Sequence, residues 1–279
     1  MHNIKLTLAY DGTDFRGWQI QPGQPTIQGS LADVLFKLTQ ERLTVHAAGR
    51  TDAGVHATGQ VAHFRTHSEL CAAEFQRAFN ALLPPEIRVM AAEEVGQDFH
   101  ARWNALAKTY RYRIFRGRVV PPCVWRYVLH DPYPLDFDAM AAAARQFEGE
   151  LDFTSFAASS GSEEDDRERT TARIIYRSEL LAAGLGNGPS PDEWVYKVRG
   201  KSFLRYMVRK IVGTLVEVGR GKLSPADILK LIELRDRTKS GPTMPPQGLC
   251  LAQVEYPDPT DSLGVMVNSQ PASPGKEQR

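Results

Sequence analysis

The order of the predicted secondary-structure elements is the feature that most constrains the fold of this chain. Residues 4–10 alternate between apolar and polar side chains, as in a half-buried strand, and apolar residues recur at helical spacing after Thr26. The next predicted elements are strands at 43–48 and 60–66, a helix at 72–83 and a strand at 87–93. The order strand, helix, strand, strand, helix, strand is typical of ferredoxin-like folds and of many RNA-recognition modules.

A comparable order of elements starts again after Trp103. The predicted elements are strands at 109–115, 172–180, 194–200 and 249–256 and helices at 137–147 and 203–218. We therefore expect an α+β fold of two ferredoxin-like subdomains, residues 1–104 and 105–257. Their strands should form a central, mostly antiparallel sheet with helices on one side and an active-site cleft between the subdomains. Residues 258–279, rich in Pro, Ser and Gln, are expected to be a disordered tail.

Composition excludes several classes of protein. No run of about 18 apolar residues is present, which argues against a membrane-spanning protein. The amino terminus enters the first predicted strand directly, without a charged and then apolar leader, so we expect a cytoplasmic protein. The cysteines are odd in number and far apart, as expected of reduced thiols.

The net charge of +1 says little, but basic residues are concentrated in two windows without acidic residues. In residues 99–130, seven Lys and Arg residues are interleaved with Trp, Tyr and Phe, and residues 194–216 hold six more Lys and Arg residues. Basic and aromatic residues in this arrangement are typical of nucleic-acid surfaces. The alternative is a set of strands with Arg facing outward and aromatic residues facing inward.

Asp52 stands apart, because it is the only acidic residue between Glu41 and Glu69. Arginines and histidines surround it in the sequence, so we expect its carboxylate to stay ionised and to act as a nucleophile or a charge stabiliser. Gly49 and Gly54 bracket the segment and allow its backbone tight conformations close to a ligand. The alternative is that Asp52 only caps a turn.

Two further segments supply candidate site residues. In the predicted helix at 203–218, Arg205 and Arg209 fall together beside the apolar stripe, and we expect Arg209 to pair with Asp52. In the predicted strand at 109–115, alternation turns Tyr110 inward and Arg111 to the opposite face. The alternatives are arginines whose stems cover the core and a tyrosine that only packs.

Other chemistries find less support in the sequence. His63 and His67 have helical ligand spacing, but the residues around His63, at 61–65, are predicted to form a strand, and no third metal ligand stands out. A glycosidase would need a second carboxylate, and no glycine-rich nucleotide fingerprint is present. We therefore set a zinc site, a glycosidase and a nucleotide-binding loop aside.

The motifs resemble those of the TruA-type tRNA pseudouridine synthases along almost the whole chain. The matching segments are GRTDAGVH at 49–56 with GQV at 59–61, KTYRY at 108–112, FL at 203–204, MVR at 207–209 and IVG at 211–213. The resemblance implies isomerisation of uridine to pseudouridine at positions 38–40 in the anticodon stem-loop of tRNA. It also implies a homodimer that works without a cofactor.

The resemblance also implies roles for single residues. Asp52 corresponds to the catalytic aspartate, Tyr110 to the tyrosine that stacks on or deprotonates the flipped base, and Arg209 to the arginine paired with the aspartate. Arg50 would fill the space that the base leaves. Together with Arg205, Gln60 and Arg111, these residues form the predicted substrate-binding set.

Two alternatives to this enzyme remain. The first is a non-catalytic RNA-binding protein built from the same units, although such a protein gains nothing from an anion facing phosphates. The second is a nucleoside hydrolase, which would need a positioned water and usually a metal or a second acid.

Overall fold

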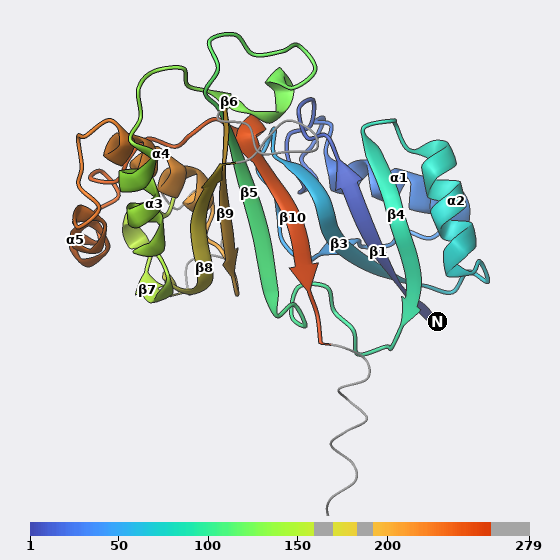
Figure 1. Ribbon diagram of the computed structural model, residues 1–279. Helices are drawn as coiled ribbons and strands as arrows, with labels where there is room; N and C mark the ends of the chain where they lie inside the picture. Colours follow the sequence, from blue (N-terminus) through green and yellow to red (C-terminus); the bar gives the residue numbers. More distant parts are fainter. Residues whose placement is uncertain (159–169, 183–191, 258–279) are drawn as a thin grey trace, which may run out of the picture.

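A computed structural model describes residues 1–158, 170–182 and 192–257 (Figure 1). The first half contains β1 (His2–Tyr10), α1 (Ile27–Thr39), β2 (His46–Ala47), β3 (His56–Thr66), α2 (Ala72–Leu82) and β4 (Ile87–Val95). The second half contains β5 (Ala107–Phe115), β6 (Leu129–His130), α3 (Phe137–Arg145), β7 (Gly149–Asp152), β8 (Ala172–Ala182), β9 (Glu193–Gly200), α4 (Met207–Gly219), α5 (Asp227–Leu234) and β10 (Leu249–Glu255). The expected α+β fold is confirmed.

The strands form one ten-stranded sheet, which is mostly antiparallel. The first half has the spatial order β4-β1-β3-β2 and the second half the order β10-β5-β9-β8, with β7 beyond β8. When β6 and β7 are left aside, each half has four strands, and in each half the last strand lies next to the first, followed by the third and the second. On this repeated order we propose the division into subdomains at residues 1–104 and 105–257.

The two halves join where β3 and β10 pair in parallel, with His56 opposite Cys250 and Ala57 opposite Leu251. Just below this point the two backbones come very close at Gly59. A Cβ atom there would lie 2.3 Å from the carbonyl oxygen of Ala252, so only glycine fits. The glycine in GQV thus lets the two halves form one sheet.

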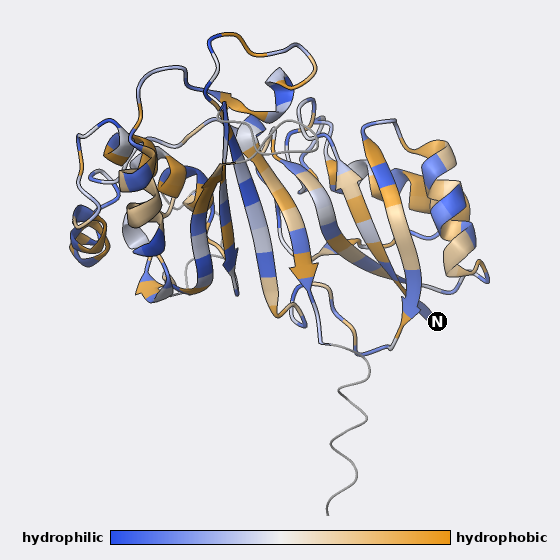
Figure 2. Ribbon diagram, in the orientation of Figure 1, coloured by the Kyte–Doolittle hydropathy of each residue, from blue (hydrophilic) through white to orange (hydrophobic). Residues whose placement is uncertain are grey.

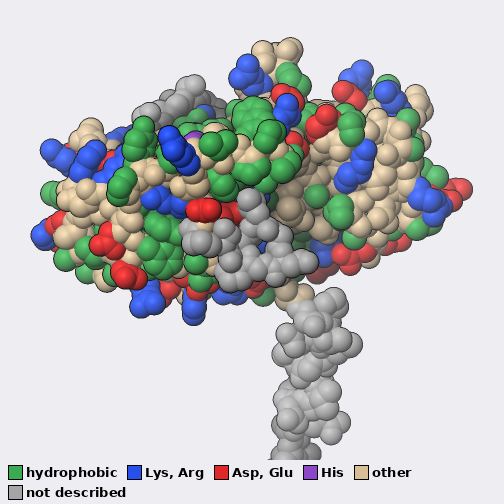
Figure 3. All heavy atoms as spheres, turned by 45° about the horizontal axis from the view of Figure 1, so that its top comes forward, with side chains coloured by type: hydrophobic (Ala, Val, Ile, Leu, Met, Phe, Trp, Pro, Cys, Tyr) green, Lys and Arg blue, Asp and Glu red, His purple; other side chains and the backbone are tan. Residues whose placement is uncertain are grey.

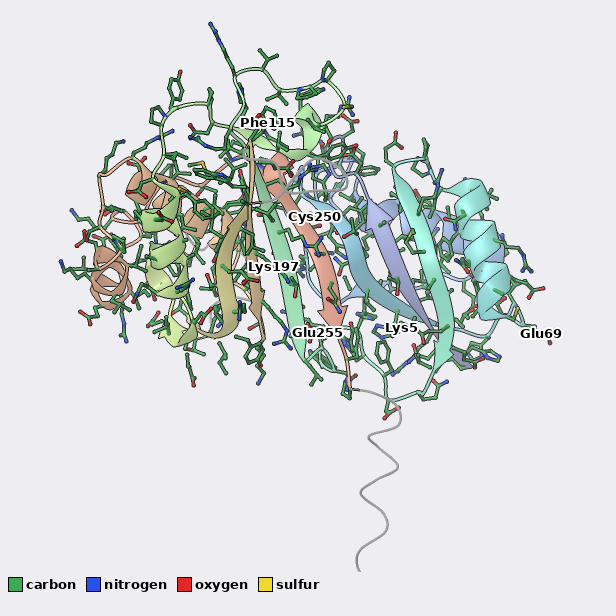
Figure 4. The ribbon with its side chains drawn as sticks, viewed as in Figure 1. Lys5, Glu69, Phe115, Lys197, Cys250 and Glu255 are labelled. Atoms are coloured by element: carbon green, nitrogen blue, oxygen red, sulfur yellow. The ribbon has the colours of Figure 1, made fainter. Side chains whose placement is uncertain are left out.

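The helices pack against one face of the sheet, and alternate strand residues are buried between the two layers (Figures 1 and 2). In β1, for example, Ile4, Leu6 and Leu8 are buried, and Phe64 of β3 contacts Phe75 and Phe79 of α2 edge-on. We call the other face of the sheet the open face. Lys5, Lys197, Cys250 and Glu255, labelled in Figure 4, lie along strands of this sheet.

The structure corrects the start of the fourth predicted helix. The apolar spacing predicts a helix from residue 203, whereas α4 begins at Met207. Tyr206 has φ 62 and therefore lies in the left-handed region, which interrupts a right-handed helix before this point. The short strands β6 and β7 and helix α5 are elements that the periodicity does not predict. The predicted tail at 258–279 lies outside the described residues, as does the segment at 159–169, which is rich in acidic residues.

Within the described residues, no helix combines the length and the apolar character needed to cross a membrane. On the surface, hydrophobic side chains gather in the middle of the view in Figure 3, and Lys and Arg side chains lie around them.

We predict that Gly213→Ala destabilises the protein by about 1–3 kcal/mol, although alanine favours helices. A Cβ atom at Gly213 would lie 1.8 Å from the carbonyl oxygen of Pro242, so α4 or the following segment must move. Thermal unfolding measures the change. As a control, Gly29→Ala in α1 should cost less, because its Cβ would come closest to the Thr26 hydroxyl, a side-chain atom. An unchanged melting temperature in Gly213→Ala would contradict the close packing of α4.

Candidate active site

The loop between β2 and β3 carries Asp52 and is fixed from the sheet below it. Gln60 on β3 donates a hydrogen bond from Nε2 to the carbonyl oxygen of Gly49 (2.7 Å). The hydroxyl of Tyr10 on β1 lies 2.8 Å from Oγ1 of Thr51. The first of these contacts is half-buried and the second is buried, so the backbone on the amino-terminal side of Asp52 is anchored to two strands.

Asp52 forms an ion pair with Arg209 in the first turn of α4. Nη1 of Arg209 lies 3.3 Å from Oδ2 of Asp52, and the two side chains are only 12% and 20% exposed. The Nε atom of the same guanidinium donates to the carbonyl oxygen of Met244 (2.6 Å). A second partner at the other edge of the guanidinium limits its rotation, so Arg209 holds the carboxylate in one orientation.

Tyr206 is a component of the site that sequence analysis misses. Its ring lies between two guanidinium groups, with the Cζ atoms of Arg205 and Arg209 each 4.9 Å from the ring centre. The helical projection predicts that Arg205 and Arg209 share one side of a helix. Instead, Arg205 precedes α4, and the left-handed backbone of Tyr206 places the aromatic ring between the two cations.

Burial and charge act in opposite directions on Asp52. Burial raises the pKa of the carboxyl group above its ordinary value, although the charge and hydrogen bond of Arg209 and the charge of Arg205 act to lower it. The expected positive surroundings are therefore present, but the sequence does not show the burial that outweighs them. The carboxylate has lost much of its water while keeping one strong hydrogen-bond donor, an arrangement that suits attack on an electron-poor carbon.

Tyr110 lies on β5 with its side chain on the helix-covered face, only 7% exposed. Its ring meets that of Phe203 edge-on, with 5.0 Å between ring centres. Burial raises its pKa well above the ordinary range, and the negative charge of Asp52 raises it further. Tyr110 is therefore a neutral phenol at physiological pH, which favours a stacking surface over a proton acceptor.

The structure shows where the other residues of the predicted substrate-binding set lie. Gln60 is 0% exposed and supports the loop from below, so the structure gives it a positioning role. Arg111 is exposed on the open face, on the side of β5 opposite Tyr110, because neighbouring strand residues alternate. Arg50 is exposed in the Asp52 loop, and Arg205 is exposed next to Tyr206.

A cavity of about 660 Å³ lies at the junction of the halves. Its lining comes from β1, β3, β4, β5, β9 and β10 and the loops next to them, and it includes Arg111, Arg113 and Cys250. Asp52 and Tyr110 are not among its lining residues.

The histidines on either side of Asp52 in the sequence contact other residues. The rings of His46, His63 and His100 lie within 4.6–5.3 Å of one another, and burial with neighbouring charges lowers the pKa of His63 to about 4. Nδ1 of His56 lies 3.1 Å from Oδ1 of Asp11. Among the described residues, no group of three or more His, Cys, Asp or Glu side chains is arranged to hold a metal ion.

A buried carboxylate held by one arginine beside a neutral tyrosine is the arrangement of a candidate enzyme site rather than of a simple binding surface. Comparison with known proteins names the family. Residues 7–104 and 143–257 match the family model described as tRNA pseudouridine synthase.

Curated relatives agree with this match. The tRNA pseudouridine synthase A of Solibacter usitatus is 47% identical over 92% of this chain and 100% of its own length. The tRNA pseudouridine synthase A 1 of Desulfotalea psychrophila is 44% identical over the same shares. This chain belongs to the tRNA pseudouridine synthase family, whose members isomerise uridine in tRNA. The alternative of a non-catalytic RNA-binding protein is not favoured.

We predict that Arg209→Met raises the pKa of Asp52 further, because burial remains while the main stabilising charge and its hydrogen bond are removed. Carboxyl ¹³C NMR of labelled aspartate, with Asp52→Asn to assign the resonance, measures the change. Arg205→Met is the matched control and should give a smaller rise, since Arg205 acts on Asp52 through its charge alone. Equal titration in wild type and Arg209→Met would contradict the role of this ion pair.

Proposed function

We propose that this enzyme converts uridine to pseudouridine at positions 38–40 in the anticodon stem-loop of tRNA, with Asp52 as the catalytic residue. The observation that carries the proposal is the buried Asp52–Arg209 ion pair, which brings the GRTDAGVH segment to the MVR segment beside Tyr110. Three separate motifs of the family thus meet around one carboxylate.

The reaction requires little beyond a positioned anion. The bond from ribose C1′ to N1 breaks, C1′ then bonds to C5, the proton on C5 is lost, and N1 gains a proton. Atoms and charge balance without a cofactor. Asp52 would stabilise the positive charge that develops at C1′ or attack this carbon directly, and Arg209 keeps its carboxylate oriented.

The target base has to leave the helical stack before this chemistry, at a cost of a few kcal/mol. We propose that the base stacks on Tyr110, whose phenol is neutral, and that Arg50 fills the space the base leaves. Arg205 lies beside Tyr206 at the entrance to α4 and supplies positive charge for the RNA backbone.

The same proposal includes a cytoplasmic homodimer that works without metal or organic cofactor. The open face of the sheet supports the dimer, because its junction cavity is lined by alternating apolar and charged side chains such as Met90, Val195 and Arg113. Under this proposal Arg111 serves the open face rather than the base pocket.

We predict that Asp52→Asn abolishes turnover while tRNA affinity stays within a few-fold of wild type. The amide keeps the size of the side chain but removes the negative charge that the reaction needs. Tritium release from tRNA labelled at uridine C5 measures turnover, and filter binding measures affinity. Transcripts with cytidine at position 38, 39 or 40 identify the modified sites.

Asp138→Asn is the matched control for this experiment, because the side chain of Asp138 is exposed in the first turn of α3, and this variant should keep wild-type turnover. Appreciable tritium release by Asp52→Asn would remove Asp52 from the catalytic role. Binding without release by wild type would favour the RNA-binding alternative, and free uracil would indicate a hydrolase.

We also predict that light scattering gives twice the chain mass of 31.1 kDa. A Met90→Glu variant should shift the protein toward the monomer, because a charge placed in an apolar contact is costly to bury. A monomeric wild type at micromolar concentration would contradict the proposed dimer.

A further inference from the structure

Lys108 is a buried cation that the proposed reaction does not use. It lies on β5 two residues before Tyr110, so both side chains belong to the same face of the sheet. Lys108 is only 9% exposed. No hydrogen bond or ion pair of its ammonium group is found among residues 1–158, 170–182 and 192–257.

A buried lysine without an anionic partner is unfavourable in the free protein. Lysine is almost never buried without a partner, because the ammonium group loses water and gains nothing in return. Burial and, to a lesser extent, the positive charge of Arg102 lower the pKa of Lys108 to about 8. Lys108 is therefore a cation with no anionic partner among the described residues, which is what an anion-binding site requires.

The ammonium group is aimed at the catalytic loop. A Cβ atom at Gly49 would lie 3.3 Å from Nζ of Lys108 and 3.6 Å from its Cε. Gly49 is therefore in contact with the end of this side chain, while Gln60 holds its carbonyl oxygen from the neighbouring strand. A residue larger than glycine at this position would cover the cation.

Lys108 also lies apart from the reacting carboxylate. The cations that lower the pKa of Asp52 are Arg209 and Arg205. Residues two apart on a strand are about 6.5–7 Å apart along it. Lys108 is thus about one nucleotide-sized step along β5 from Tyr110, a distance that suits the sugar–phosphate chain next to a base stacked on Tyr110.

We propose that Lys108 binds a phosphate group of the tRNA backbone next to the target uridine. The inference rests on the proposed placement of that uridine on Tyr110. An ammonium group offers three donors and no acceptor, so its natural partner is an anion, and phosphates are the anions that an RNA substrate supplies. The neighbouring positive charge of Arg102, which is unfavourable in the free protein, then assists binding.

Two variants distinguish a role of Lys108 in tRNA binding from a role in folding. Lys108→Met keeps the length of the side chain and removes its charge, whereas Lys108→Arg keeps the charge. Lys108→Met should bind tRNA at least about tenfold more weakly, because one charged contact is lost. The slope of log affinity against log salt should fall by about 0.7–0.9, which corresponds to one phosphate. Its melting temperature should equal or exceed that of wild type.

A pH series provides an independent readout. Phosphate binding favours the charged lysine, so wild-type affinity should fall as the pH rises from 7 to 9 through the pKa of about 8. The affinity of Lys108→Arg should fall less over this range, since arginine stays charged. Arg102 and Lys108 are the charged groups concerned, and Arg102 does not titrate in this range.

Three outcomes would overturn the proposal. One is a Lys108→Met variant with wild-type affinity and salt slope, and another is a lowered melting temperature that accounts for the lost binding. The third is unchanged affinity with loss of single-turnover tritium release at saturating tRNA, which would assign Lys108 to proton transfer. If wild type itself releases no tritium, the proposed function fails, while the affinity and salt measurements still decide the role of Lys108.

Discussion

The ion pair between Asp52 and Arg209 joins two parts of the chain that are 157 residues apart. It forms only because three independent features agree. Gln60 and Tyr10 fix the loop of Asp52, the left-handed backbone of Tyr206 sets the start of α4, and Met244 holds the guanidinium from behind. A shift in any of these would separate two charges that are both largely removed from water. With Asp52 as the proposed catalytic residue, the position of α4 against the sheet matters for the chemistry as well as for the core.

Burial shifts the pKa values of Asp52 and of the groups around it, in each case in the direction that favours the neutral form. It raises the pKa of Asp52 and Tyr110 and lowers that of Lys108. The site thus holds an anion, a neutral phenol and a cation that each depend on what covers them. Binding of a large polyanion covers them further and adds charges of its own. The electrostatics of the free enzyme are consequently those of a site prepared for its substrate.

Sequence patterns predicted the fold well, because period and order report directly on which face of a strand or helix is buried. They also brought Asp52 and Arg209 together as a pair, while the catalytic roles of both residues stay predictions. The patterns failed where the structure depends on one backbone dihedral angle or on how deeply a side chain is buried. The residue types around Tyr206 do not indicate a left-handed backbone, so the helix was expected to start at residue 203. Strand alternation did predict that Arg111 lies opposite Tyr110, but no pattern showed that Gln60 is buried beneath the loop of Asp52.

The place of β10 in the sheet has a consequence for how the protein is made. This strand is the last element of the described chain, yet it lies in the middle of the sheet, between β3 and β5. A ribosome delivers residues 249–255 after all other strands, so the two halves remain without their common neighbour until then. The nascent halves have local contacts from which to begin folding, but the joined sheet must wait. An RNA that meets the growing chain therefore finds no finished enzyme until synthesis has passed β10.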